Sequence, residues 1–245
     1  MKPAKSLNDV KRLPPGKERF SEVMTVAYEQ NIAPTLVLAH RLPLEMKINL
    51  TIKRLFDLLF SSIFLVLILS WMIPLVALLI KLDSQGPVFF LQKRYGRNGR
   101  LFTCIKFRTM IVNHDADRLP ALVDDSRITK LGAFLRKNHL DELPQLLNVW
   151  LGEMSLIGPR PHMISDNLKY EELLKFYSYR HKVKPGLTGW AQVHGYVGVV
   201  ANLEAMRERV KKDIYYIHHW SLMMDARIIG MTLFKMFPPS QKIQN

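Results

Sequence analysis

The chain has 245 residues, of which 48% are hydrophobic, enough for a folded core and too many for a disordered chain. Its 35 Lys and Arg residues outnumber 21 Asp and Glu residues, and the net charge of +14 predicts an anionic partner such as nucleic acid, acidic lipid or a phosphorylated substrate. The single cysteine, Cys104, excludes an internal disulfide and a cysteine-rich zinc site, and we expect it to be a small buried residue.

The first part of the chain is polar and contains no apolar signal-peptide core. We expect residues 1–50 to form a cytoplasmic N-terminal extension, with an amphipathic helix around residues 19–30. An uncharged apolar run follows at residues 58–80. As a helix it would reach about 35 Å, enough to cross a hydrocarbon core of about 30 Å.

The residues on either side of this run do not favour a helix that spans the membrane. Basic residues stand on both sides, with Lys53 and Arg54 before it and Lys81 after it, and such residues collect on cytoplasmic flanks. Pro74, inside the run, removes a backbone donor and bends a helix. The sequence therefore predicts a kinked, re-entrant helical hairpin over residues 51–82. A single transmembrane anchor and a buried core helix are the alternatives.

The segments beyond the run carry signals for a small β-hairpin and several helices. Short runs of Val, Phe, Leu and Ile between turn residues predict strands at 88–92 and 101–107. Further on, composition and periodicity predict a helix over 166–179, a glycine-punctuated loop over 184–198, a helix over 201–219 and an apolar helical tail over 221–237, interrupted by Asp225 and Arg227 and suited to lie against a membrane surface.

Between these segments, apolar residues recur at intervals of three and four from 128 to 154, which predicts a helical region. Proline is best tolerated in the first turn of a helix, so we expect the helix to break and restart at Pro144. Asp141 and Glu142 then lie near a helix N-terminus, which stabilises negative charge. An Asp-Glu pair in such a place is usually a capping feature, but it can also supply a nucleophile, a proton acceptor or a metal ligand.

Cations surround this pair in the sequence. Arginine forks match phosphate oxygens, so a spaced series of basic residues predicts a site for a nucleotide diphosphate, with scattered surface charge as the alternative. In GPRP, two prolines fix the backbone around Arg160 and lower the entropy lost on binding. The series consists of Lys106, Arg108, Arg127, Arg136, Arg160, Arg180 and Lys184.

Taken in order, these motifs resemble the bacterial sugar transferase family, the monotopic phosphoglycosyl transferases that begin lipid-linked glycan assembly. The matching text includes KRLFD, KFRTM, LDELPQ, GPRP and PGLTGWAQ. The resemblance implies a predominantly helical α+β fold with a re-entrant hairpin, a β-hairpin and amphipathic interfacial helices. Residues 83–245 would form the catalytic domain on the cytoplasmic face of the bacterial inner membrane. Many members have a Ser-Pro step at the hairpin break, whereas here Ser70 precedes Trp71 and the proline is Pro74, which shifts the expected bend.

The resemblance also implies an activity. Asp141 would attack the β-phosphate of a UDP-sugar, release UMP and form a phosphosugar-aspartyl intermediate that undecaprenyl phosphate then attacks. Glu142 would position groups or handle a proton, and Mg²⁺ would be held partly by Asp141. The expected substrate contacts are Lys106, Arg108, Arg127, Arg136, Pro159, Arg160, Arg180, Lys184 and Gln192.

The same resemblance places the reaction at the first membrane step of exopolysaccharide, capsule or O-antigen synthesis. Expected partners are anionic membrane lipids, downstream glycosyltransferases and a second copy of the chain in a homodimer, with no nucleic acid. Two other readings remain. A membrane-anchored nucleic-acid-binding protein would need basic residues interleaved with exposed aromatics on one element. An inactive scaffold would use residues 1–50 as a docking arm.

Overall fold

The computed structural model describes residues 42–113, 125–198 and 202–236. The amphipathic helix expected around residues 19–30 lies outside the described residues, as does most of the expected N-terminal extension. The described chain is mostly helical and carries short strands, which confirms the predicted balance of helix and strand.

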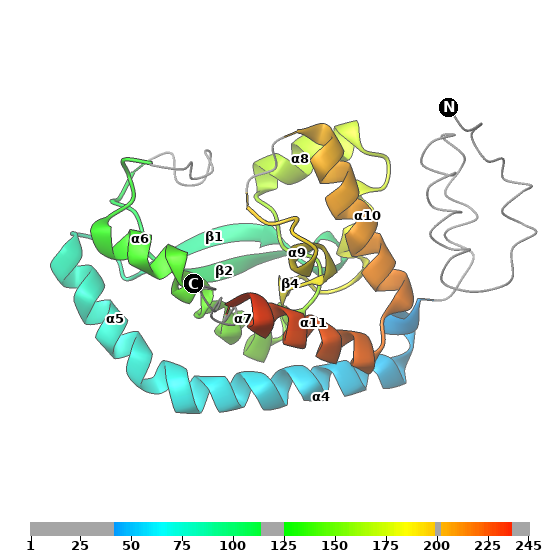
Figure 1. The fold of residues 1–245 in the computed structure, drawn as a ribbon, viewed down its shortest axis with the longest axis horizontal. Coiled ribbons are helices and arrows are strands. Elements are labelled where there is room, and N and C mark those ends of the chain that lie inside the picture. Colours follow the sequence, from blue (N-terminus) through cyan, green and yellow to red (C-terminus); the bar gives the residue numbers. More distant parts are fainter. Residues whose placement is uncertain (1–41, 114–124, 199–201, 237–245) are drawn as a thin grey trace, which may run out of the picture.

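One long apolar helix underlies the molecule. It consists of α4 (Lys47–Phe64), the π-helical turn η2 (Leu65–Leu69) and α5 (Ser70–Asp83), which follow one another without interruption. By length and composition this helix could cross a membrane, and only 22% of its most apolar window is buried in the protein. Figure 1 shows it as an arc along one edge of the molecule, with the other elements on the concave side.

The backbone irregularity in this helix lies at η2. The Ser70 N–H donates to the Leu65 carbonyl, five residues back, and the Ser70 hydroxyl donates to the Val66 carbonyl at 2.5 Å. The hydroxyl thus satisfies a carbonyl that an α-helical Ser70 N–H would have bonded. The sequence predicted the irregularity at Pro74; the structure places the irregular turn before it, and α5 continues through the proline.

A two-stranded antiparallel sheet lies inside the arc. Its strands are β1 (Phe89–Tyr95) and β2 (Leu101–Phe107), joined through the turn η3 (Arg97–Gly99). The predicted second strand is confirmed at both ends, whereas the first begins one residue later and runs three residues further than predicted. Cys104 is buried on β2, as expected.

The helical region after the sheet is broken before Pro144 and restarts after it, as predicted from the sequence. It comprises α6 (Lys130–Lys137), the 3-10 turn η4 (Leu140–Glu142) and α7 (Gln145–Leu151), and Pro144 immediately precedes α7. His139 adopts a left-handed backbone conformation, with φ 56°, between α6 and η4. This conformation is uncommon for a residue with a side chain. It ends α6 and turns the chain into η4, which carries Asp141 and Glu142.

The structure contains a second small sheet that was not predicted from the sequence. Strands β3 (Ser155–Ile157) and β4 (Gly186–Thr188) pair in parallel, and the short helix α9 (Trp190–Val193) follows. The prediction of a loop over 184–198 is therefore wrong across β4 and α9. A Cβ at Gly186 would lie 2.1 Å from the Gly158 backbone nitrogen, so a glycine is required for the GPRP segment to approach β4.

The remaining helices cover the sheets. The helix predicted over 166–179 is wrong in its second half: α8 (Ile164–Leu173) ends, the chain turns, and the 3-10 helix η5 (Tyr177–Lys182) follows. The turn buries Leu174 and Phe176 in the core beside α10 (Leu203–His219), whose prediction is confirmed. The predicted apolar tail is the helix α11 (Leu222–Met236).

Polar side chains on α4 tie the long helix to the rest of the protein. Asp57 accepts hydrogen bonds from the Ser155 hydroxyl and the Leu156 N–H, both at 3.0 Å. Lys53 lies 2.7 Å from Asp225 of α11, which is fully buried. Asp225 was expected only to interrupt an apolar tail; instead it anchors α11 to α4.

Candidate active site

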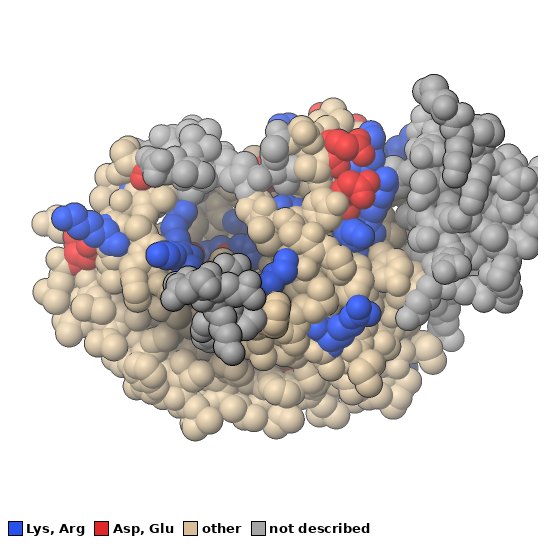
Figure 2. Space-filling view, viewed as in Figure 1, with Lys and Arg blue, Asp and Glu red and all other residues tan. Residues whose placement is uncertain are grey.

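Three segments that are far apart in the sequence meet in one polar cluster. Lys106 comes from β2, Asp141 and Glu142 come from η4, and Arg160 comes from the loop after β3. Figure 2 shows that the molecule is hollowed near the middle of this face, with Lys and Arg atoms around and inside the hollow. A hollow lined by cations suits an anionic substrate.

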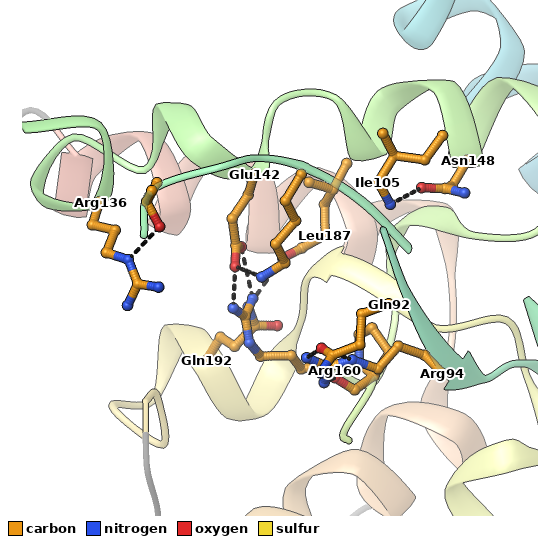
Figure 3. A network of polar contacts seen from close by, with 12 residues as sticks. Gln92, Arg94, Ile105, Arg136, Glu142, Asn148, Arg160, Leu187 and Gln192 are labelled. Atoms are coloured by element: carbon orange, nitrogen blue, oxygen red, sulfur yellow. Dashed lines mark hydrogen bonds and ion pairs between the residues drawn. The ribbon is translucent and has the colours of Figure 1, made fainter. Parts of the chain in front are cut away.

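Glu142 is the centre of the cluster. Its Oε1 accepts from Lys106 Nζ at 2.6 Å and from Arg160 Nη2, and its Oε2 accepts from Arg160 Nη1 at 2.9 Å. Figure 3 shows Glu142 and Arg160 pointing toward each other. Burial raises the pKa of the Glu142 carboxyl, but the charges of Arg160 and Lys106 outweigh it and hold that pKa well below its usual range. Glu142 is therefore a fixed anion that orients two cations.

Hydrogen bonds from the protein interior fix the backbone of the loop that carries Arg160. Arg180 donates to the Arg160 carbonyl at 2.7 Å and pairs with Asp213 at 2.8 Å, both deep in the protein. The Pro159 carbonyl accepts from the Gly186 N–H at 3.0 Å, and Arg94 donates to the Pro161 carbonyl at 2.9 Å. These bonds leave the Arg160 backbone little freedom.

Asp141 differs from its neighbour. Among the residues that the structure describes, no hydrogen bond or ion pair engages its carboxylate. Burial raises the pKa of Asp141 above its usual range and the adjacent Glu142 charge adds to the rise, against the opposing charges of Lys106, Arg136 and Arg160. A partly buried carboxylate with no bonding partner, beside fixed cations, is chemically available as a nucleophile or a ligand.

Two further predicted residues border the cluster. Arg136 on α6 donates from Nε to the Thr109 hydroxyl at 2.7 Å, which leaves its two terminal nitrogens for other contacts. Gln192 on α9 donates to the Leu187 carbonyl at 3.0 Å, while its Oε1 is buried without a hydrogen-bond partner in the described chain. Figure 3 shows Gln192 beside Arg160.

The structure places the remaining predicted cations elsewhere. Arg108 donates to the Ser84 and Gln85 carbonyls at 2.6 and 2.7 Å and so closes the loop after α5. Arg127 pairs with Asp125 at 2.6 Å. Lys184 lies beside Gly152, near α4. Arg180 supports the Arg160 loop from within the protein rather than lining the hollow.

Two contributing residues were missed by the sequence interpretation. Thr109 orients Arg136, and Arg94 supports the loop at Pro161. Thr109 stands in KFRTM, one of the motifs that carry the resemblance, and Arg94 lies on β1. Their roles depend on contacts between distant segments, for which the sequence carries no local signal.

The side chains of the cluster allow one kind of magnesium site, in which a single carboxylate and the substrate phosphates hold the ion. No group of three or more His, Cys, Asp and Glu side chains in the described ranges could enclose a metal. Mg²⁺ commonly binds through one or two carboxylates together with substrate phosphates. Asp141 fits such a role because its carboxylate has no partner in the described chain, whereas Glu142 is already neutralised by two cations.

Comparison with known proteins gives a consistent result. The model of the family described as "Bacterial sugar transferase" matches residues 48–239. Over 191 residues the chain is 47% identical to a UDP-glucose:undecaprenyl-phosphate glucose-1-phosphate transferase of Klebsiella pneumoniae, covering 78% of this chain and 41% of that protein.

Two other relatives differ in length and in name. The chain is 46% identical over 190 residues to the exopolysaccharide production protein PSS of Rhizobium leguminosarum bv. phaseoli, covering 76% of this chain and 94% of that protein. It is 42% identical over 184 residues to a UDP-N-acetylgalactosamine-undecaprenyl-phosphate N-acetylgalactosaminephosphotransferase of Aeromonas hydrophila, covering 74% of this chain and 43% of that protein. The chain thus spans about two fifths of the Klebsiella and Aeromonas relatives. With a family model matched over most of its residues, this chain belongs to the bacterial sugar transferase family.

Proposed function

We propose that this protein transfers a sugar 1-phosphate from a UDP-sugar to undecaprenyl phosphate, giving undecaprenyl-diphosphate-sugar and UMP. The observation that carries the proposal is the unpaired Asp141 carboxylate beside the cluster of Glu142, Lys106 and Arg160. The printed names of the Klebsiella and Aeromonas relatives, which specify a UDP-sugar and undecaprenyl phosphate, support both substrates.

In the first step, an Asp141 oxygen attacks the β-phosphorus of the UDP-sugar. A phosphorus–oxygen bond to Asp141 forms, the bond from that phosphorus to the bridging oxygen breaks, and UMP leaves with the bridging oxygen and its electrons. In the second step, an oxygen of undecaprenyl phosphate attacks the same phosphorus and Asp141 is released unchanged. Two displacements through one covalent intermediate predict ping-pong kinetics.

The cations stabilise the charge that develops on the phosphate. Lys106 and Arg160 are oriented by Glu142, and Arg136 is oriented by Thr109, so all three are positioned before substrate binds. Positioned charges cost no reorganisation during the reaction. The low pKa of Glu142 supports a positioning role over proton donation.

Magnesium would be held by Asp141 and by the substrate diphosphate. When bound, it would offset negative charge on the phosphates. Lys106, Arg160 and Arg136 contribute positive charge independently of the ion, and the buried Oε1 of Gln192 offers an acceptor for a donor group on the substrate.

The long helix supports a monotopic placement on the cytoplasmic face of the inner membrane. Both ends of the arc turn toward the side that holds the other elements (Figure 1), and the lower edge of the molecule, along the middle of the arc, shows no charged atoms in Figure 2. The exposed charges of α5, Lys81 and Asp83, lie at its C-terminal end. Apolar side chains such as Leu59, Val66 and Leu78 are exposed along the arc. With basic residues near both ends, a re-entrant helix would bring the hollow to the depth of a lipid phosphate.

The test is UMP release by the purified full chain in detergent. Mg²⁺, undecaprenyl phosphate and a panel of UDP-sugars are supplied, starting with UDP-glucose, and Asp141→Asn is measured alongside. We expect UMP with at least one sugar and a loss of at least about 1,000-fold in the variant. Release that survives Asp141→Asn would reject the mechanism, and silence across the panel would favour the scaffold reading.

A further inference from the structure

A second group of cations lies away from the hollow, at the C-terminal end of α7. Lys184 Nζ and the Arg54 guanidinium carbon each lie 3.4 Å from the position that a Cβ would take at Gly152. The two charges are therefore within about 7 Å of each other, close enough to repel in the absence of an anion. Arg97 lies near enough for its charge, like that of Arg54, to act on Lys184.

Nothing in the described chain neutralises this group by an ion pair. Arg54 donates to the Val149 and Trp150 carbonyls at 2.7 and 2.6 Å, which satisfies its hydrogen bonding but supplies no full negative charge. Lys184 has no hydrogen bond or ion pair among the described residues, and Arg97 Nε is buried without a partner. Burial lowers the pKa of Lys184, and the Arg54 charge lowers it further.

The nearby carboxylate is already engaged. Asp57 lies close enough to act on Lys184, but its Oδ1 accepts two hydrogen bonds from β3, from the Ser155 hydroxyl and the Leu156 N–H. This carboxylate also lies beside Lys53, so it does not balance the charges of Arg54, Arg97 and Lys184. Such an excess of positive charge favours a bound anion.

The surroundings indicate the kind of anion. Arg54 belongs to α4, where Leu55 is 62% exposed, and it contacts the end of α7, where Trp150 and Leu151 are 47% and 60% exposed. Tryptophan beside exposed leucine and arginine is typical of the headgroup level of a membrane. A small soluble anion would not cover these apolar side chains. A phospholipid would contact the cations with its headgroup and the apolar side chains with its acyl chains.

We propose that Arg54, Arg97 and Lys184 form a binding site for the phosphate of an anionic phospholipid, whose acyl chains lie along the exposed Leu55, Trp150 and Leu151. This site shares no residue with the cluster of Glu142, Lys106 and Arg160. The inference relies on the membrane placement of α4 in the proposed function, but not on the transfer reaction.

Lipid retention tests the site directly. The full chain in neutral detergent is mixed with phosphatidylglycerol, phosphatidylcholine or undecaprenyl phosphate, and native mass spectrometry measures the fraction that keeps each lipid. Lys184→Gln removes a charge without removing a hydrogen bond found in the structure, so it should leave the fold intact. The variant Arg54→Gln, Lys184→Gln removes two charges, and Lys169→Gln, Lys175→Gln is its matched control on exposed residues at the α8 end of the molecule.

We expect the wild type to retain phosphatidylglycerol over phosphatidylcholine. Each lost cation should lower that retention about fivefold, so about 25-fold in the double variant, with the control unchanged. Equal losses in the control, or equal retention of both phospholipids, would overturn the proposal. It would also be overturned if Lys184→Gln reduced retention of undecaprenyl phosphate alone, since the site would then bind the acceptor. UMP release is measured separately, so failure of the transfer reaction and failure of the lipid site give different results.

Discussion

Asp141 and Glu142 are adjacent in η4, yet their surroundings give them opposite properties. Glu142 is bonded to Lys106 and Arg160, and its pKa lies well below its usual range. Asp141 has a raised pKa and no bonding partner in the described chain. Since the nucleophile must be free to reach a phosphorus atom and the orienting anion must not move, this difference assigns Asp141 and Glu142 different roles in the proposed reaction.

The raised pKa of Asp141 predicts the acid limb of the pH profile. The nucleophile must be ionised, so kcat/KM should fall as pH drops through a pKa above the 3.8 of an ordinary Asp. Arg136 is one of the cations that lower this pKa, so Arg136→Gln should move the limb to still higher pH. The profiles are measured at one Mg²⁺ concentration, with Arg100→Gln, an exposed cation beyond η3, as the control. A limb that stays in place in Arg136→Gln would contradict the assignment.

Glu142 should matter for stability as well as for activity. Glu142→Gln leaves Lys106 and Arg160 without a counter-charge, and loss of such charged hydrogen bonds should lower the free energy of unfolding by about 2 kcal/mol. The matched control is Glu204→Gln, which breaks the exposed pair with Arg207 and should cost less than about 0.5 kcal/mol. Thermal unfolding in detergent compares them, and equal effects would show that Glu142 does not hold the cluster.

Among single residues, those at the centre of the candidate site were predicted from the sequence more accurately than the cations around them. Asp141, Glu142 and Arg160 stand in compact motifs with distinctive chemistry, and the structure brings Glu142 and Arg160 into contact. Arg108 stands in an equally distinctive motif, but its partners are backbone carbonyls of Ser84 and Gln85. Carbonyl groups are the same in every residue, so no sequence pattern identifies them as partners.

At the scale of elements, α4 and α11 are joined by a buried polar contact. Asp225 accepts from Lys53, from the Tyr216 hydroxyl at 2.8 Å and from the Trp220 indole at 3.0 Å. Asp57, one turn along α4 from Lys53, binds β3, which leads directly into the Arg160 loop. The contacts of one helix face therefore fix both α11 and the strand that positions the site.

This contact predicts a double-mutant result. Asp225→Asn removes the ion-pair partner of the buried Lys53 ammonium and leaves it only the charge of Asp57, which is already bonded to β3, so it should cost about 3 kcal/mol, which corresponds to a fall in Tm of about 6–12 °C. Lys53→Met combined with Asp225→Leu removes both charges, and it should recover much of that loss. Thermal unfolding of the wild type, Lys53→Met, Asp225→Leu and the variant that combines these two substitutions gives the coupling energy. Additive losses would contradict a direct ion pair.

Which elements could be predicted depended on their length. The strand β2 and the helix α10 show clear alternation or helical spacing, and both appear where predicted. The strands β3 and β4 have three residues each, too few for a periodic pattern, and they form because distant segments pair. The partner of Lys53 lies 172 residues away, which explains why Asp225 was taken for an interruption.

At the scale of the whole molecule, the apolar arc and the polar hollow belong to one arrangement. The long helix exposes its convex side, and the elements of the candidate site lie on its concave side (Figures 1 and 2). If the helix is re-entrant, both of its ends face the cytoplasm. If it spans, the segment before α4 and the segment after α5 face opposite compartments.

Cysteine labelling distinguishes these topologies. In a Cys104→Ser background, Lys47→Cys and Gln85→Cys place single thiols at exposed positions at the two ends of the arc. An impermeant maleimide added to intact spheroplasts should label neither variant and, after lysis, should label both. Labelling of one end in intact spheroplasts would establish a spanning helix and contradict the re-entrant proposal.

The central claim is that Asp141 forms a covalent bond to the sugar phosphate, and omitting the acceptor tests it most directly. The purified chain is mixed with Mg²⁺ and the UDP-sugar that supports UMP release, without undecaprenyl phosphate, and intact-mass and peptide spectra are recorded. We expect a burst of one UMP per active site and a sugar-phosphate adduct on the peptide containing Asp141, both absent in Asp141→Asn. Turnover with acceptor present, but no burst and no adduct in its absence, would contradict it.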